Sequence, residues 1–163
     1  MSPEIVQQAR TACGELRLLG KPKRRTRRPT PEELNRLREH FKGRDRRAEI
    51  PMGAVMDFAI ASARRELEIC RLEWRDNDKT ARTGMVRNAK HPTGKEGNHR
   101  RFKYTPEAWA LVRAQPRTGE YIFPYDPKSV GAAFTRACKL LGIQDLRFHD
   151  LRHEATSCLF ERG

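Results

Sequence analysis

The spacing of apolar residues constrains the fold most, because in much of this 163-residue chain they recur every three or four positions. Such spacing puts apolar side chains on one face of an α-helix, whereas a half-buried strand alternates apolar and polar residues. It predicts helices over residues 3–20, 30–42, 52–63, 65–74, 105–114 and 129–142, and a last helix that begins near His149. The chain is therefore expected to be mainly helical.

Two of these helices begin with the same local signal. Thr30-Pro31-Glu32-Glu33 offers a threonine that can cap the first turn, a proline that fits the first helical position, and acidic residues at the positive end of the helix dipole. Thr105-Pro106-Glu107 repeats this arrangement. Gly142 marks the expected end of the helix over residues 129–142, because glycine readily adopts the left-handed conformation at a helix C-terminus.

Two segments are typical of strands in a hairpin. Residues 83–87 and 100–104 flank residues 90–99, a loop whose glycines, proline and asparagine favour a reversal of the chain. Residues 121–125 add a short apolar strand or turn. The expected fold class is mainly α with a small antiparallel β-sheet (α+β), in one domain, since 163 residues are too few for two comfortable cores.

The charge balance favours a polyanionic partner. The chain has 34 Lys and Arg against 21 Asp and Glu, a formal net charge of +13, and nucleic acid is the simplest partner for such a surface. A basic but inert surface and binding to an anionic membrane are the competing interpretations. No apolar run approaches the roughly 20 residues that cross a bilayer, and no signal-peptide core is present, so we expect a soluble, cytoplasmic protein.

Basic residues are concentrated between residues 21 and 29, in a run bracketed by prolines. Such a run cannot bury enough apolar surface to fold, so we expect an extended linker. A solvated tether or a nuclear-import signal is the alternative. The predicted contacts to a DNA phosphate backbone are its basic side chains: Lys21, Lys23, Arg24, Arg25, Arg27 and Arg28.

Cysteine and histidine spacings do not predict a metal site. The four cysteines form no Cys-x-x-Cys unit, so neither a zinc ribbon nor a disulfide framework is indicated. Cys70 and Cys138 lie in apolar-periodic segments and are expected in the core. His149 and His153 are four residues apart, but Asp150 stands where the zinc-protease pattern needs a glutamate.

One string near the end of the sequence, residues 147–155, sets an imidazole and a guanidinium three residues apart. On a helix, His149 and Arg152 project from the same face. The pair suits an anionic oxygen, because imidazole exchanges protons near neutral pH and arginine keeps its charge and offers a planar fork of donors. Taken alone, such a pair more often marks a solvated helix start.

A second string, residues 62–76, contains an arginine followed by a glutamate, a leucine and an aspartate at three, seven and eleven positions: Arg65, Glu68, Leu72 and Asp76. These four spacings resemble the first signature box of the tyrosine recombinases, the phage-integrase family. The string around His149 resembles the second box, and the two boxes stand in the family's order. The resemblance covers residues 30–163.

This resemblance implies the integrase catalytic-domain fold and an enzyme that integrates or excises mobile DNA. The family cuts one DNA strand through a 3′-phosphotyrosine intermediate and rejoins it without a metal or any other cofactor. By this resemblance Arg65 and Arg152 clamp the scissile phosphate and His149 assists proton movement. Lys90 on the hairpin resembles the lysine that protonates the leaving oxygen, with Lys95 as its rival.

In this family the nucleophilic tyrosine follows the second box, and no tyrosine follows Arg152 in this sequence. The resemblance also implies an N-terminal DNA-clamping domain before the basic run, so we expect residues 1–20 to be a remnant helix from the end of that domain. Residues 21–29 are then the linker and residues 30–163 a catalytic domain without its last helices. The chain alone is predicted to bind double-stranded DNA but to be inactive, and its full-length parent to act as a homotetramer.

The rival interpretation is a non-catalytic DNA-binding decoy or regulator with the same fold. A decoy has no need of the full set of predicted catalytic residues, and a helix-turn-helix repressor has no support in the spacing. Arg64 adjoins Arg65, so the choice of Arg65 depends on its spacing to Glu68. We interpret Glu68 as an orienter of arginine or as a partner within its helix, and not as a proton carrier. The three tyrosines are interpreted as packing or DNA-contact residues: Tyr104, Tyr121 and Tyr125.

Overall fold

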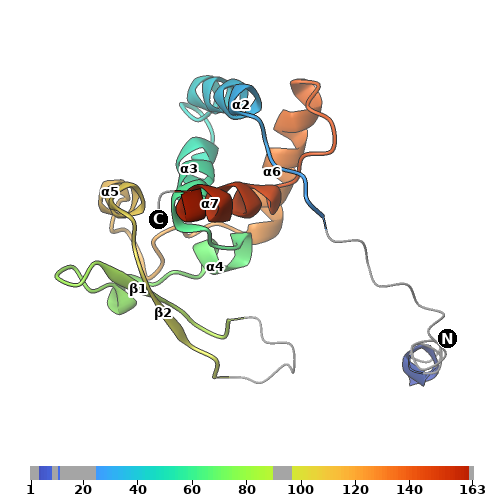
Figure 1. The fold of residues 1–163 in the computed structure, drawn as a ribbon. Helices are drawn as coiled ribbons and strands as arrows, with labels where there is room; N and C mark the ends of the chain where they lie inside the picture. Colours follow the sequence, from blue (N-terminus) through green and yellow to red (C-terminus); the bar gives the residue numbers. More distant parts are fainter. Residues whose placement is uncertain (1–3, 9–10, 12–24, 90–96, 162–163) are drawn as a thin grey trace.

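The structure is a computed structural model and describes residues 4–8, 11, 25–89 and 97–161. It confirms the predicted fold class, mainly helical with a two-stranded antiparallel sheet (Figure 1). The labelled elements are α2 (Pro31–Arg44), α3 (Met52–Ser62), α4 (Glu66–Cys70), the 3₁₀ helix η1 (Trp74–Asp76), β1 (Thr83–Val86), β2 (Arg100–Lys103), α5 (Pro106–Ala114), α6 (Pro127–Leu140) and α7 (Asp150–Glu161).

Helix α3 forms the centre of the core, as its apolar sequence predicts. It contacts α2, α4, α5, α6 and α7, and its Val55, Met56 and Phe58 side chains are fully buried. The Phe58 ring packs on Phe123, with ring centroids 4.8 Å apart. Figure 1 shows α7 crossing α3 in the middle of the molecule, so the last described helix is built into the core.

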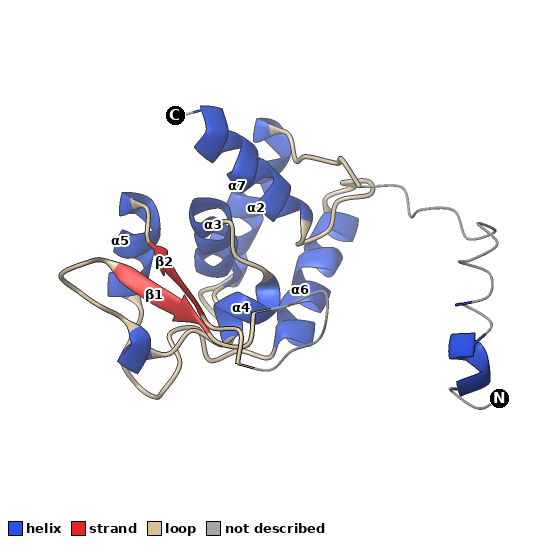
Figure 2. Ribbon diagram, turned by 60° about the horizontal axis from the view of Figure 1, so that its bottom comes forward, coloured by secondary structure: helices blue, strands red, loops and turns tan. Residues whose placement is uncertain are grey.

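The sheet lies to one side of the helices, next to α5 (Figure 2). Thr83 pairs with Lys103 and Val86 with Arg100. Gly84 and Val86 are buried and face the core. The connection between the two strands includes residues 90–96, so the predicted hairpin lysines, Lys90 and Lys95, lie outside the described residues.

Two element boundaries differ from the sequence-based expectation. Helix α6 begins at Pro127 and not at Ser129, because the Asp126 carboxylate accepts a hydrogen bond from the Ser129 backbone N–H at 2.8 Å and so caps the helix. The helix predicted over residues 65–74 is divided. The Leu72 carbonyl accepts from the N–H of Ile122 and the Trp74 N–H donates to Glu120, a strand-like pairing that ends α4 before η1.

Cys70 and Cys138 are buried free thiols, as expected. Burial raises the pKa of Cys70 to about 12 and that of Cys138 to about 11, so both behave as small core residues. Within the ranges that the structure describes, none of the helices has the length and apolar character needed to cross a bilayer.

Candidate functional site

Glu68 holds Arg65 at the start of α4. The Arg65 Nη1 atom lies 2.7 Å from Glu68 Oε1, and the Arg65 backbone N–H donates to Glu68 Oε2 at 3.1 Å. The carboxylate therefore caps the helix and fixes the guanidinium beside it. Glu68 is buried, whereas the Arg65 side chain is 40% exposed, so the head of the arginine remains accessible to a ligand.

Arg152 approaches the same carboxylate from α7. Its Nη1 atom lies 3.7 Å from Glu68 Oε2, which is an ion pair but too long for a hydrogen bond. This buried nitrogen has no hydrogen-bond partner among the described residues. Burial and the charge of Arg65 lower the pKa of Arg152. One carboxylate thus faces two guanidiniums, which leaves a net positive charge and an unfilled donor.

His149 immediately precedes α7, three residues before Arg152. Its ring packs edge-to-face against His153, with ring centroids 5.4 Å apart. Burial, followed by the nearby positive charges of His153, Arg152 and Arg65, lowers the pKa of His149. The imidazole is therefore mainly neutral at neutral pH, and a neutral imidazole can accept a proton on one nitrogen and donate from the other.

Arg65 and His149 line an open pocket of about 360 Å³. Lys128, at the start of α6, brings a third basic side chain to the same pocket. Lys128 could not be predicted from the sequence, because no spacing relates it to either box. Leu67 also lines the pocket and is 47% exposed.

The phage integrase family model matches residues 27–163, a span that contains both boxes and the paired arginines. The chain belongs to the phage integrase family. This is a family of tyrosine recombinases, enzymes that break and rejoin DNA. The chain is 33% identical over 150 residues to a shufflon-specific DNA recombinase of Escherichia coli, in an alignment that covers 90% of this chain and 37% of that protein.

Solved structures of integrases share the fold. A lambda integrase dimer bound to a COC′ core site matches with a TM-score of 0.67 at 19% identity, over 87% of this chain and 43% of the integrase. A lambda integrase tetramer bound to a Holliday junction matches with a TM-score of 0.65 at 18% identity, over 91% of this chain and 49% of the other. This chain therefore spans less than half the length of these relatives.

The other residues of the first integrase box have packing roles. Leu72 is buried in the core. Asp76 accepts two hydrogen bonds from Arg87, at 2.7 Å and 2.8 Å, and so ties η1 to the end of β1. Arg64 contacts the sheet, with its guanidinium 4.6 Å from the centroid of the Phe102 ring. Arg65, and not Arg64, is thus the arginine that pairs with Glu68.

Tyr104 is a packing residue. It is buried, and its hydroxyl donates to Asn77 Oδ1 at 2.7 Å. Burial raises the pKa of Tyr104, the opposite of what an activated tyrosine nucleophile needs. Within the described residues, no group of three or more His, Cys, Asp or Glu side chains is placed to hold a metal ion.

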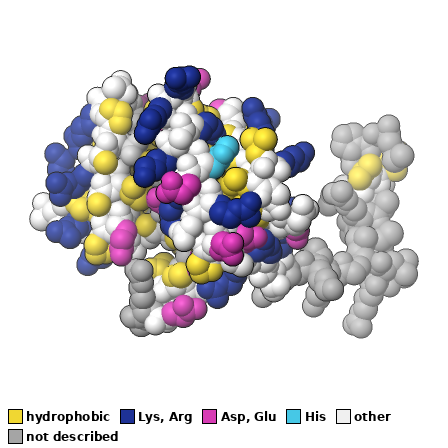
Figure 3. Space-filling model, turned by 90° about the horizontal axis from the view of Figure 1, so that it is seen from above, with side chains coloured by type: hydrophobic (Ala, Val, Ile, Leu, Met, Phe, Trp, Pro, Cys, Tyr) yellow, Lys and Arg dark blue, Asp and Glu magenta, His cyan; other side chains and the backbone are white. Residues whose placement is uncertain are grey.

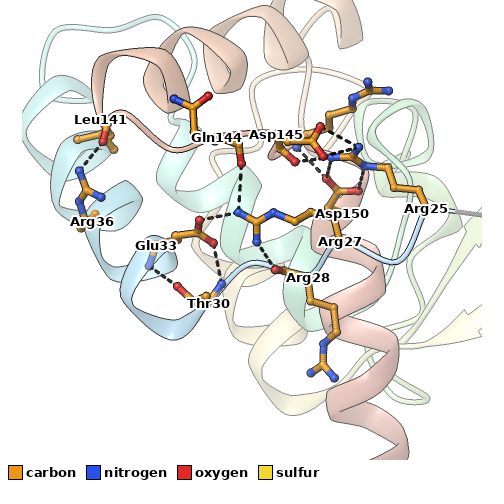
Figure 4. A network of polar contacts seen from close by, with 11 residues as sticks. Arg25, Arg27, Arg28, Thr30, Glu33, Arg36, Leu141, Gln144, Asp145 and Asp150 are labelled. Atoms are coloured by element: carbon orange, nitrogen blue, oxygen red, sulfur yellow. Dashed lines mark hydrogen bonds and ion pairs between the residues drawn. The ribbon is translucent and has the colours of Figure 1, made fainter.

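The arginines of the predicted linker that the structure describes are paired with carboxylates, and Figure 4 shows the partners of Arg25 and Arg27. Arg25 pairs with Asp145 and Asp150. The role of Arg25, Arg27 and Arg28 as DNA contacts stays a prediction. The same holds for Lys21, Lys23 and Arg24, which lie outside the described residues. The remaining pairs are Arg27 with Glu33 and Arg28 with Glu154 and Glu161.

Proposed function

We propose that this chain carries the phosphate pocket of a site-specific DNA recombinase. The observation that supports the proposal most directly is the convergence of Arg65 and Arg152 on Glu68, with a buried Arg152 nitrogen that lacks a hydrogen-bond partner among the described residues. Two guanidiniums held side by side repel each other unless anions compensate their charge. A phosphodiester bound beside them would supply this charge.

The same groups suit the chemistry of strand cleavage. In an attacked phosphodiester, negative charge is spread over the non-bridging oxygens, and fixed donors that point at these oxygens lower the barrier. Arginine suits the role because it stays charged at neutral pH even when burial lowers its pKa. His149, mainly neutral, is proposed to take up or release the proton of the attacking oxygen. Lys90, or its rival Lys95, is proposed to protonate the leaving oxygen.

These 163 residues alone are proposed to bind double-stranded DNA without forming a covalent adduct, because no tyrosine follows Arg152 and Tyr104 is buried and hydrogen-bonded. The net charge of +13 supports DNA as the partner. Figure 3 shows Lys and Arg side chains spread over the face seen from above. Assembly as a tetramer on DNA is proposed for the full-length parent.

A nicked suicide substrate tests this proposal. We expect the polypeptide to retain the duplex in a native gel at low salt and to give no protein–DNA adduct in a denaturing gel. A covalent adduct would overturn the statement about the nucleophile, and failure to retain DNA at low salt would overturn the proposed partner.

The full-length parent separates the recombinase from the non-catalytic DNA-binding module. In that protein, Arg152→Ala should abolish cleavage and weaken DNA binding only modestly, because one phosphate contact among many is lost. An equal loss of cleavage and binding would favour the non-catalytic module.

A further inference from the structure

The segment over residues 25–28 lies against the second box and is bound to it by ion pairs from Arg25 to Asp150 (Figure 4) and from Arg28 to Glu154. Arg25 Nε lies 2.7 Å from Asp150 Oδ1 and Arg25 Nη2 lies 2.8 Å from Asp150 Oδ2. The remaining nitrogen, Nη1, lies 2.9 Å from Asp145 Oδ1. The whole guanidinium is therefore used by two carboxylates, and this geometry is more specific than that of a solvated basic tether.

Asp150 is the more constrained of the two partners, because its side chain is fully buried. Among the described residues, its carboxylate accepts one further hydrogen bond, from the Arg147 backbone N–H to Oδ2 at 2.9 Å. A buried carboxylate that loses its charged partner carries a large desolvation penalty. Without Arg25, Asp150 must therefore bind a proton or move toward water.

Either response would disturb the turn that carries the phosphate-directed residues. The backbone N–H groups of Asp150, Leu151 and Arg152 donate to the carbonyls of Arg147, Phe148 and His149, so this turn is wound tightly at the start of α7. Asp150 lies directly between His149 and Leu151 within it. A shift of its carboxylate would move the His149 ring and the Arg152 guanidinium relative to Arg65.

We propose that Arg25 is a positioning residue of the phosphate pocket: through the buried Asp150 carboxylate it holds the turn that orients His149 and Arg152. This inference depends on the proposed function for its catalytic meaning, but its structural content can be tested without DNA. If Arg25 has this role, the segment preceding α2 contributes to the pocket by ordering the turn at the start of α7. Arg25 itself then makes no contact with the phosphate.

The test uses NMR spectroscopy of the 163-residue chain, with the wild type compared with Arg25→Ala, Arg25→Lys and Arg28→Ala. The readouts are the Arg152 Nε–H signal and the pH titration of the His149 ring. Arg28→Ala is the matched control, because it removes the same charge from the same segment and breaks an ion pair to Glu154, further along α7. The charged or titratable groups that face His149 are His153, Arg152, Asp150, Arg65, Glu66 and Lys128.

For Arg25→Ala we expect displaced Arg152 and His149 signals and a pKa of His149 that differs from the wild type, because the burial of the ring and the charge of Asp150 both act on it. Arg25→Lys should give intermediate shifts, since lysine restores the charge but not the two-pronged geometry. Arg28→Ala should leave both signals in place. If circular dichroism shows that Arg25→Ala is unfolded, Arg25→Lys is compared with the wild type in its place.

Unchanged His149 and Arg152 signals in the folded Arg25 variant would overturn the proposal, and so would equal shifts in Arg28→Ala. These outcomes are distinct from failure of the proposed function. A chain that retains no DNA in any variant contradicts the proposed DNA partner but leaves the NMR comparison valid.

Discussion

At the scale of single residues, the site is organised by a carboxylate. Glu68 is the common partner of Arg65 and Arg152. In Glu68→Gln the side chain keeps its shape but loses the charge, so the two guanidiniums repel each other without compensation. We expect the free energy of unfolding to fall by about 1–3 kcal/mol, measured by urea denaturation. Glu120→Gln, at an exposed pair with Arg75, should change it by less than about 0.5 kcal/mol; equal losses would contradict this role of Glu68.

Lys128 gives a residue-scale prediction for DNA binding. It lines the pocket with Arg65 and His149, so we expect it to contact a bound phosphate. Lys128→Ala should weaken binding and reduce the slope of log K against log salt by about one, measured by fluorescence anisotropy with a DNA duplex. Lys139→Ala, on an exposed position near the other end of α6, is the control. The same change of slope in both variants would rule out a specific role for the pocket.

The sequence predicts Arg65, His149 and Arg152 because each is defined by spacing within its own box. It does not predict that Glu68 pairs with both arginines, since this depends on the packing of α4 and α7 in space. The ion pair between Arg25 and Asp150 was not predicted, for a different reason. A basic, proline-bracketed run indicates solvated chain, and nothing in the local sequence identifies Asp150 as a buried partner.

At the scale of elements, the starts of α2 and α5 were predicted correctly because capping by Thr30 and Thr105 is local. Thr30 Oγ1 accepts from the Glu33 N–H at 3.1 Å, and the Thr30 N–H donates to Glu33 Oε2 at 2.8 Å. Thr30→Ala should lower the free energy of unfolding by about 1 kcal/mol, measured by urea denaturation. Thr30→Ser keeps the hydroxyl and should behave as the wild type; an equal loss in both variants would contradict the capping explanation.

The division of the segment over residues 65–74 could not be predicted from its own sequence. Apolar spacing continues through Leu72, but the backbone there pairs with residues 120–122. This competition is decided by tertiary contact and not by helix propensity.

In strand β1, the Tyr104 side chain packs closely against the backbone of Gly84. A Cβ atom at this position would lie 2.8 Å from Tyr104 Cζ, and Tyr104 is held by burial and by its bond to Asn77. Gly84→Ala should therefore lower the free energy of unfolding by about 1–3 kcal/mol, measured by urea denaturation. Gly119→Ala, with open space at the same atom, should be nearly neutral. Adding Tyr104→Phe to Gly84→Ala should recover part of the loss, because the hydroxyl is removed.

At the scale of the whole molecule, part of the excess positive charge is compensated internally, and this makes stability depend on pH. Among the described residues, four carboxylates have lowered pKa values. The hydrogen bond from Arg27 lowers that of Glu33, and the backbone N–H of Ser129 that of Asp126. Burial alone would raise the pKa values of Asp150 and Glu154, but hydrogen bonds, led by those from Arg25 and Arg28 respectively, lower them.

These shifts determine how the stability changes at acidic pH. A carboxylate with a depressed pKa binds fewer protons when folded, so its stabilisation is present above the unfolded pKa of about 4 and is lost as pH falls through the folded pKa. His149 adds an upper window, because its depressed pKa means that the unfolded chain gains a proton first, below about pH 6.5.

We therefore expect the thermal midpoint of the chain to fall in two stages as pH is lowered from 8 to 3, measured by circular dichroism. His149→Gln should remove the stage that starts near pH 6.5 and keep the one below about pH 4. Arg25→Ala should instead act on the acid stage. It should lower the midpoint at neutral pH and make the fall below about pH 4 smaller, because the pKa of Asp150 is no longer depressed by Arg25. A midpoint in the wild type that stays constant between pH 7 and 5 would contradict the role assigned to His149. An acid stage that is unchanged in Arg25→Ala would show that the carboxylate of Asp150 does not depend on its arginine.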